Sequence, residues 1–194
     1  MLFSSLVFLF YFLPIALLVY YLTPKAARNA VLLVVSLLFY MWGGTGFTLL
    51  LITSILGNFL IAKLIERSET HAKKWLTLGI VVNVALLFSF KYLDFFIRLF
   101  THEVEPALTP EQQALVKVIL PVGISFYTFH QLSMLRDIYR DRTLPKVSLV
   151  NMSLYVALFP QLVAGPIVRY KDIIYQIHSR TETIDMLYRG VQRF

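Results

Sequence analysis

The residues best placed to do chemistry form a polar stripe inside a long apolar stretch of the sequence. The members of this stripe are Tyr127, His130, Ser133, Asp137 and Arg140. Their spacings of three, three, four and three residues would place all five side chains on one face of an α-helix. A polar stripe of this kind must avoid contact with lipid, so we expect it to face the inside of a helix bundle.

His130 has two interpretations, and the sequence leaves both open. An ionisable residue within a membrane span is costly, which favours a functional role in a pocket or tunnel. Alternatively, the imidazole is neutral, bonds to a neighbouring helix and contributes only packing. Ser125, His130 and Asp137 have the residue types of a catalytic triad, but separations of five and seven residues on one helix cannot orient them as one.

A second segment, 159–166, contains two prolines and several small residues. These residues would leave backbone amides and carbonyls unpaired by the helix, which fits the lining of a pocket or channel. Small residues also let two helices cross closely, and this structural explanation stays equally open. Together the two segments give the pocket-lining or tunnel-lining candidates Ser125, Tyr127, His130, Ser133, Asp137, Pro160, Gly165 and Pro166.

The rest of the sequence offers no other chemical site. His71, His102 and His178 lie among charged residues, as ordinary surface histidines do. Cysteine is absent, so a disulfide, a thiolate nucleophile and a cysteine-bound metal are excluded. No histidine or carboxylate cluster has metal-ligand spacing, and Gly43–Gly46 is more typical of a turn than of a phosphate-binding loop. We therefore expect no bound metal or cofactor.

The elements that position these residues are membrane helices. Hydrophobic residues make up 58% of the chain and charged residues only 15%, which is well below the usual share in soluble domains. Lipid offers no partners for free backbone groups, and the alternation of a spanning β-barrel is missing, so the fold class is all-α: a multi-span helical bundle. The net charge is +7, and nearly all lysine and arginine residues lie between the apolar runs or at their edges. This distribution argues against nucleic-acid binding.

We expect five spans and one incomplete crossing. The run from 29 to 62 is too long for one span and contains the Gly43–Gly46 turn, so it is divided in two. The first hydrophobic segment has no positive amino-terminal region and is interpreted as a retained span. The expected spans are 4–23, 29–42, 47–62, 75–90 and 118–135, followed by a broken or re-entrant segment at 147–168.

Lysine and arginine alternate between the connecting segments. Their number is two in 25–28, none in the glycine turn, four in 63–74, three in 91–117 and four in 136–146. The positive-inside rule then places the amino terminus outside and the segments 25–28, 63–74 and 136–146 in the cytoplasm. A complete sixth crossing would put five further basic residues outside, so we expect 147–168 to return to the cytoplasmic side.

Several short sequences, taken in order, are similar to one known family. They are Phe3-Ser4-Ser5, Ser36 through Trp42, Phe90-Lys91-Tyr92, Leu120 through Tyr127, Asp137-Ile138-Tyr139-Arg140, and Phe159-Pro160 through Ala164-Gly165-Pro166. The chain resembles the bacterial membrane-bound O-acyltransferases (MBOAT family), and Arg169 to Asp172 with His178 to Thr181 resemble the alginate O-acetyltransferase group. His130-Gln131 and Arg136 depart from the family pattern.

The resemblance implies transfer of an acyl group, acetyl by analogy, to hydroxyls of a cell-surface polysaccharide such as alginate. The donor, acetyl-CoA or an acyl carrier, would act from the cytoplasmic side of the bacterial inner membrane. Periplasmic acetylation partner proteins would assist on the acceptor side. The family's histidine general base lies in the second half of a longer chain, and no histidine here sits in its context. We therefore expect an amino-terminal fragment that lacks a catalytic residue and is inactive alone.

Two alternatives come from other classes of protein. Broken helices near 121 and 160 could form a substrate or ion path in a transporter or channel, although no internal repeat is visible. The chain could also be a non-catalytic membrane module that binds a partner. Flux through proteoliposomes without acyl transfer would favour the transporter, and co-purification of a partner without acyl transfer would favour the module.

Overall fold

The computed structural model describes residues 5–92, 121–165, 168–180 and 182–193, and the regular elements in these ranges are all helices. The all-α class is therefore confirmed for this part of the chain. The helices are η1 (Phe8–Phe12), α1 (Leu13–Leu22), η2 (Lys25–Ala27), α2 (Arg28–Met41), α3 (Thr45–Arg67), α4 (Ala72–Lys91), α7 (Ile124–Arg140), α8 (Leu149–Ala157), α9 (Phe159–Ala164), α10 (Tyr170–His178) and α11 (Ile184–Arg193).

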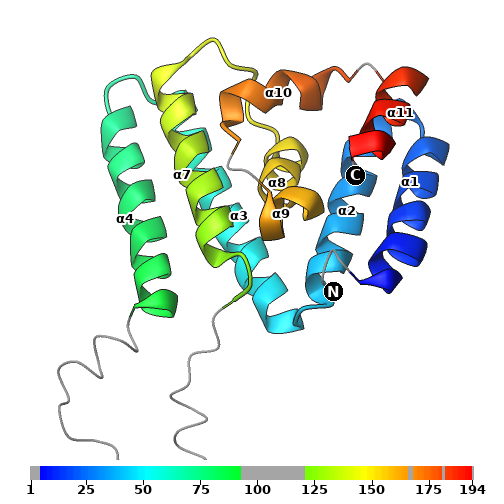
Figure 1. Ribbon diagram of the computed structural model, residues 1–194. Coiled ribbons are helices and arrows are strands. Elements are labelled where there is room, and N and C mark those ends of the chain that lie inside the picture. The colour runs from blue at the N-terminus through cyan, green and yellow to red at the C-terminus, as the bar shows by residue number, and fades with distance from the viewer. Residues whose placement is uncertain (1–4, 93–120, 166–167, 181, 194) are drawn as a thin grey trace, which may run out of the picture.

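The longer helices run side by side, and α10 lies across one end of them (Figure 1). The connections from α1 to α2, from α3 to α4 and from α7 to α8 all lie at this end, while the turn from α2 to α3 lies at the opposite end (Figure 1). The most extensive helix contacts join α4 with α7, α2 with α8, and α3 with both α4 and α7. Helix α7 therefore packs against two of the apolar helices that precede it in the sequence.

Two helices, α3 and α4, are long and apolar enough to cross a bilayer, and the apolar helix at Phe8–Leu22 is shorter. Much of the apolar surface faces outward, as on α4, where Val81 is 57% exposed and Val84 is 50% exposed. Such a surface suits lipid rather than water, so the chain is an integral membrane protein. Helix α3 extends beyond the expected range 47–62 and ends at Arg67.

The backbone breaks between α8 and α9, as the prolines and small residues of this segment favour. Helix α8 ends at Ala157, Leu158 leaves the helical conformation, and Pro160 stands in the first turn of α9. The Phe159 amide, which the break frees, donates to Ser36 Oγ on α2 at 3.2 Å. The connection that leads into α8 lies at the end of the bundle where α10 lies (Figure 1), and the predicted return of 147–168 to one side of the membrane stays a prediction.

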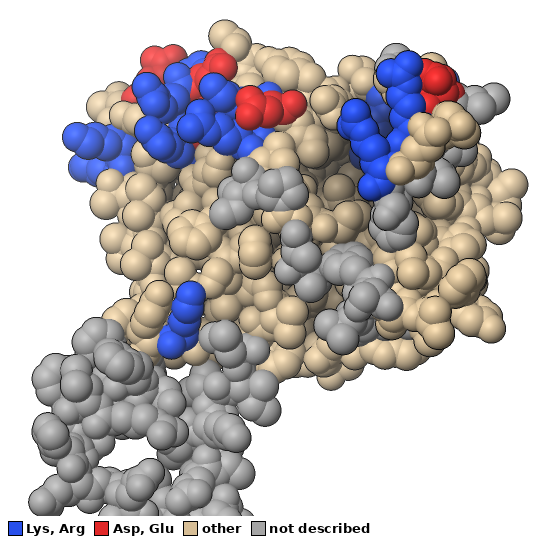
Figure 2. All heavy atoms as spheres, in the orientation of Figure 1, with Lys and Arg blue, Asp and Glu red and all other residues tan. Residues whose placement is uncertain are grey.

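Charged residues gather at that same end. On the face shown in Figure 2, lysine, arginine and acidic side chains cluster there, and the middle of the molecule is almost free of them. Arg28 at the start of α2 pairs with Glu182, which also accepts a hydrogen bond from the Tyr20 hydroxyl. Arg180 donates to Asn29 Oδ1 at 2.9 Å. These contacts tie the segment between α10 and α11 to the first two helices.

Candidate functional site

The polar stripe lies on α7, and a glycine turn sets where this helix begins. Gly123 precedes α7 with φ +78°, in the left-handed region. A Cβ atom at this position would lie 2.8 Å from the Leu162 carbonyl oxygen of α9. The Tyr40 hydroxyl of α2 donates to the Val122 carbonyl at 2.7 Å and holds the turn from the other side. Glycine is therefore required here by both its conformation and its neighbour.

Because α7 is continuous from Ile124 to Arg140, the stripe shares one helix face, and its burial changes along the helix. Tyr127 and His130 are buried, Ser133 and Asp137 are partly buried, and Arg140 is exposed at the charged end. The Asp137 carboxylate accepts a hydrogen bond from the Lys171 amide at 3.3 Å, beside the first turn of α10. The stripe thus leads from the charged end into the interior of the bundle.

At its inner end, His130 contacts the broken segment. Its Nε2 lies 2.9 Å from Gln161 Nε2, so the amide donates to an imidazole whose proton is on Nδ1. The imidazole packs edge-on against the ring of Tyr155 on α8, with 5.3 Å between ring centroids. Tyr155 in turn packs against Tyr170 of α10 at 5.1 Å, and its hydroxyl donates to the Val168 carbonyl at 2.8 Å. Four helices therefore meet around His130.

Five buried polar atoms in the described ranges have no hydrogen-bond partner, and four of them belong to α7. They are Tyr127 Oη, Thr128 Oγ1, His130 Nδ1, Gln131 Nε2 and, on α10, Tyr170 Oη. A buried polar atom without a partner is unfavourable by about 1–3 kcal/mol, so a concentration of them needs an explanation. These atoms can donate to or accept from a polar group that enters the bundle.

A second set of buried polar side chains lies beside His130, and the sequence analysis did not single it out. We define the amide cluster as Asn58 on α3, Asn83 on α4 and Gln131 on α7. Asn83 Nδ2 donates to Asn58 Oδ1 at 2.7 Å, and Asn58 Nδ2 donates to Gln131 Oε1 at 2.9 Å. Ser54 also donates to Gln131 Oε1 at 2.9 Å. The cluster links three helices through side-chain hydrogen bonds inside an apolar environment.

The sequence carried a usable signal for this cluster. Asn58 and Asn83 are each an uncharged amide within an apolar run, and amides at such positions commonly bond between membrane helices. Gly79 lies one helical turn before Asn83. Here α4 packs closely against α7, because a Cβ at Gly79 would lie 2.6 Å from the side chain of Leu135. Which amides pair with one another depends on the packing of three helices, which the sequence alone does not provide.

Three of the remaining candidates, Ser125, Pro160 and Gly165, lie at the ends of α7 and α9. Ser125 is partly buried in the first turn of α7. Pro160 is exposed, and its neighbour Gln161 is the residue that reaches His130. Gly165 ends α9, where a Cβ would lie 2.6 Å from the Gln161 Cα atom. Pro166 lies outside the described residues.

His71 and His178 lie apart from the stripe. His71 is exposed at the start of α4, and His178 lies at the charged end, where its Nε2 is 3.2 Å from Asn151 Nδ2. His102 belongs to the stretch that the structure does not describe. Within the described ranges, no group of three or more histidine and acidic side chains is arranged to hold a metal ion.

These features define an all-helical membrane protein with a polar centre built on a broken helix. The chain is 39% identical over 197 aligned residues to a Pseudomonas aeruginosa protein named probable alginate O-acetylase AlgI. The aligned region covers all of this chain and 38% of the relative. It is 40% identical to the Pseudomonas putida protein of the same name, again over the whole chain and over 40% of the relative. A peptidoglycan O-acetyltransferase of Helicobacter pylori is 31% identical, over 98% of this chain and 41% of its own length.

Over its whole length the chain is therefore similar to proteins named alginate O-acetylase, in agreement with the resemblance that its motifs predicted. It spans about two fifths of the length of the curated relatives it matches. No protein-family model matches the chain, and no solved structure matches it.

Proposed function

We propose that this chain is part of an O-acyltransferase that transfers an acetyl group to hydroxyls of a cell-surface polysaccharide, alginate being the best-supported acceptor. The observation that carries the proposal is the 36–40% identity to five alginate O-acetylases over the entire chain. The similarity includes the broken helix and the polar stripe. The 31% identity to a peptidoglycan O-acetyltransferase supports a polysaccharide acceptor more generally.

The charge distribution supports a location in the bacterial inner membrane with the charged end in the cytoplasm. The basic segments before α2, between α3 and α4, and after α7 all lie at that end. The amino terminus would then be outside, and 147–168 would enter and leave from the cytoplasmic side as a re-entrant segment of a multi-span bundle. A donor such as acetyl-CoA or an acyl carrier would approach the charged end. The polysaccharide and any periplasmic partner proteins would meet the opposite end.

The polar centre around His130 is proposed to line the path along which the acyl group and the acceptor hydroxyl approach each other. Tyr127, His130 and Tyr170 present buried polar atoms without protein partners, as expected for groups that contact a transient polar ligand. Ser133 and Asp137 continue this lining toward the charged end, and Ser125 toward the other. Gln161 and Gly165 would hold the broken segment against this path.

We assign the general base to none of the histidines of this chain. The imidazole of His130 bonds to Gln161 and packs against Tyr155, and no carboxylate is seen to orient it within the described residues. The longer relatives have room for further helices, and the family resemblance predicts the reacting histidine there. The role proposed for this chain is therefore to form the walls of the path and to position what passes through it.

A chimera tests the proposal directly. In a Pseudomonas aeruginosa strain that lacks its alginate O-acetylase, the matching 38% of that protein would be replaced by this chain and the rest retained. We expect the chimera to restore acetyl groups on secreted alginate, measured by NMR of the purified polymer. The intact Pseudomonas protein, expressed from the same vector, calibrates full acetylation.

A well-expressed chimera that inserts into the membrane but leaves alginate unacetylated would contradict the proposal. A parallel chimera with the matching segment of the Pseudomonas putida relative provides the control for segment exchange, since this relative has similar identity to the chain. If both chimeras failed, acetyl transfer from labelled acetyl-CoA in isolated membranes would be compared instead. Substrate-driven flux in proteoliposomes without any acetyl transfer would favour a transporter.

A further inference from the structure

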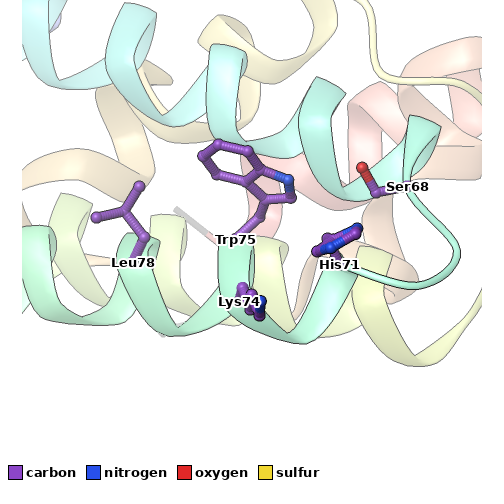
Figure 3. Close-up of a pocket in the computed structure, with 5 residues that line it drawn as sticks. All are labelled: Ser68, His71, Lys74, Trp75 and Leu78. Carbon is purple, nitrogen blue, oxygen red and sulfur yellow. The ribbon is translucent and has the colours of Figure 1, made fainter.

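A cavity beside the turn between α3 and α4 combines a polar end with an apolar side. It encloses about 540 Å³ and is lined by Ser68, His71, Lys74, Trp75 and Leu78. Figure 3 shows Trp75 extending from α4 toward α3, with Ser68 and His71 on one side of its indole and Leu78 on the other. The polar side chains stand at the charged end of the bundle, and the hydrocarbon surface continues toward its middle.

The charges around this cavity are predominantly positive. Both carboxylate oxygens of Glu66 are already bonded, one to Lys63 Nζ at 2.9 Å and the other to the Val147 amide at 2.7 Å. The Arg142 guanidinium donates to the Ser68 carbonyl at 3.4 Å and, at a shorter distance, to the Ile65 carbonyl of α3. A positive charge therefore contacts Ser68 at the polar end, while the partly buried Glu66 is already paired with Lys63.

Two lysines at the start of α4 add to this positive field. Lys73 and Lys74 are exposed, and neither forms an ion pair with an acid in the described ranges. Glu69 in the turn is the acidic side chain nearest to them in the sequence, and it does not line the cavity. Lys74 lines the cavity and Lys73 does not, although the two are adjacent.

The apolar side of the cavity continues onto the outer surface of α4. Leu78 is 44% exposed, and Val81 and Val82, three and four residues further on, are 57% and 46% exposed on the same helix face. A tryptophan at the boundary between charged and apolar surface suits the level of lipid headgroups, because its indole has an apolar body and one N–H donor.

We propose that this cavity binds an anionic glycerophospholipid of the cytoplasmic leaflet. The phosphate would accept hydrogen bonds from Lys74 and Ser68 and from the indole N–H of Trp75, with Arg142 contributing long-range attraction. One acyl chain would lie against Trp75 and Leu78 and continue along α4. Basic pockets between helices on the cytoplasmic side commonly bind lipid headgroups in this way. The inference rests on the orientation proposed above, with the charged end in the cytoplasm, and does not depend on acyl transfer.

A lipid fits this cavity better than free phosphate does. Two of the five lining residues, Trp75 and Leu78, offer hydrocarbon that a small anion would leave exposed. The phosphate of a lipid would contact the polar end of the cavity. Its acyl chain would cover the apolar side and the apolar strip that begins at Leu78. The lipid is therefore the occupant to which the test is directed.

The two tryptophans make the test specific. Trp42→Phe leaves Trp75 as the only indole, and Trp75→Phe leaves Trp42, at the opposite end of the bundle, as an internal control. The whole chain would be reconstituted into phosphatidylcholine vesicles with either brominated phosphatidylglycerol or brominated phosphatidylcholine at equal mole fraction. We expect brominated phosphatidylglycerol to quench Trp75 at least twofold more strongly and to quench Trp42 no more than brominated phosphatidylcholine does.

Substitution of the two lysines separates a cavity from general surface attraction. Lys74→Gln should lower the apparent affinity for phosphatidylglycerol about fivefold, while the matched change Lys73→Gln should alter it less than twofold. Ser68→Ala, which keeps the charge, serves as a second variant should Lys74→Gln lose helicity. Equal effects of the two lysine changes, or equal quenching by both lipids, would overturn the proposal. Displacement of phosphatidylglycerol by millimolar inorganic phosphate would instead indicate a site for free anions and would also overturn it.

Discussion

Two neighbouring residues of α7 have different surroundings, although both are buried and polar. The side chain of Gln131 accepts hydrogen bonds from Asn58 and Ser54 through its oxygen, whereas its nitrogen has no partner. The imidazole of His130 bonds through one nitrogen to Gln161, and the other nitrogen has no partner. The bonded atoms fix the rotation of α7, and the unpartnered atoms are available to a ligand. Each of these adjacent residues thus combines one positioning atom with one unpartnered atom.

Loss of one amide should weaken the packing of α3, α4 and α7. Asn83→Leu leaves Asn58 Oδ1 without its donor, so we expect destabilisation by about 1–2 kcal/mol, close to the upper range for polar contacts between membrane helices. Unfolding of the chain in mixed micelles, followed by far-UV circular dichroism, measures this change. Thr53→Leu is the matched control, since Thr53 is exposed on α3 and bonds only within its own helix. Equal destabilisation by both substitutions would contradict a role for the cluster.

His130→Phe distinguishes a ligand-contacting imidazole from one that only packs. The phenyl ring preserves the aromatic contact with Tyr155 but removes both polar atoms. In the alginate chimera we expect about tenfold slower acetyl transfer, or ~1.4 kcal/mol in activation free energy, at unchanged protein abundance. Phe129→Leu, at the adjacent and 46% exposed position, should leave transfer unchanged. Full transfer by His130→Phe together with reduced abundance would instead support the packing interpretation.

At the scale of elements, the junction of α7 with α9 depends on two backbone features. Gly123 places the first turn of α7 against the Leu162 carbonyl, and the break at Leu158 lets α9 approach this turn. Phe159, displaced by the break, packs with Phe8 and Phe12 of η1 and with Phe39 of α2. The broken segment is thus held by aromatic packing on one side and by Gln161 on the other.

Gly123→Ala should weaken this junction for two independent reasons. Alanine disfavours the φ of +78°, and its Cβ would stand 2.8 Å from a backbone oxygen, which a side-chain rotation cannot relieve. We expect destabilisation by about 2–3 kcal/mol in the micelle unfolding assay. Gly57→Ala on α3 is the control: no atom lies within 4 Å of its added Cβ, so helix propensity should make it neutral or slightly stabilising. Similar losses at both glycines would contradict a local cause.

At the scale of the whole molecule, most charged side chains on the face shown in Figure 2 gather at one end of the described part of the chain. The connection from α7 toward α8 lies at the same end of the bundle as those from α1 to α2 and from α3 to α4, and α10 lies across this end (Figure 1). Arg28, Arg180 and Glu182 then join the segment after α10 to the start of α2. If the charged end is cytoplasmic, 147–168 does not cross the membrane.

Single cysteines test this orientation, and the absence of natural cysteine makes the labelling unambiguous. We expect Glu69→Cys and Thr183→Cys to react with a membrane-impermeant maleimide only after the inner membrane is opened. Gly46→Cys, in the first turn of α3 at the other end, should react in cells with an intact inner membrane. All three positions are exposed, so burial does not confuse the comparison. Labelling of Thr183→Cys from outside would show a complete sixth crossing and contradict the re-entrant topology.

The sequence by itself indicated an all-helical membrane protein and a resemblance to O-acyltransferases. Charge-free apolar runs without the alternation of a β-barrel predict membrane helices, because only helices and closed barrels satisfy the backbone in lipid, and the described residues form helices. The stripe spacing on α7 and the break near Pro160 also follow from local rules of helix geometry and proline sterics. The short motifs gave the O-acyltransferase resemblance before any relative was compared.

Only the tertiary structure decided which polar groups meet. Asn58 and Gln131 are 73 residues apart, and His130 and Gln161 are 31 residues apart, so their contacts depend on how separate helices pack. The same holds for the cavity between α3 and α4, and for Glu182, which bridges Tyr20 and Arg28. Local sequence rules give the period and ends of a helix. The rotation and depth at which one helix faces another come from side-chain packing summed over all its neighbours, and this information is not local.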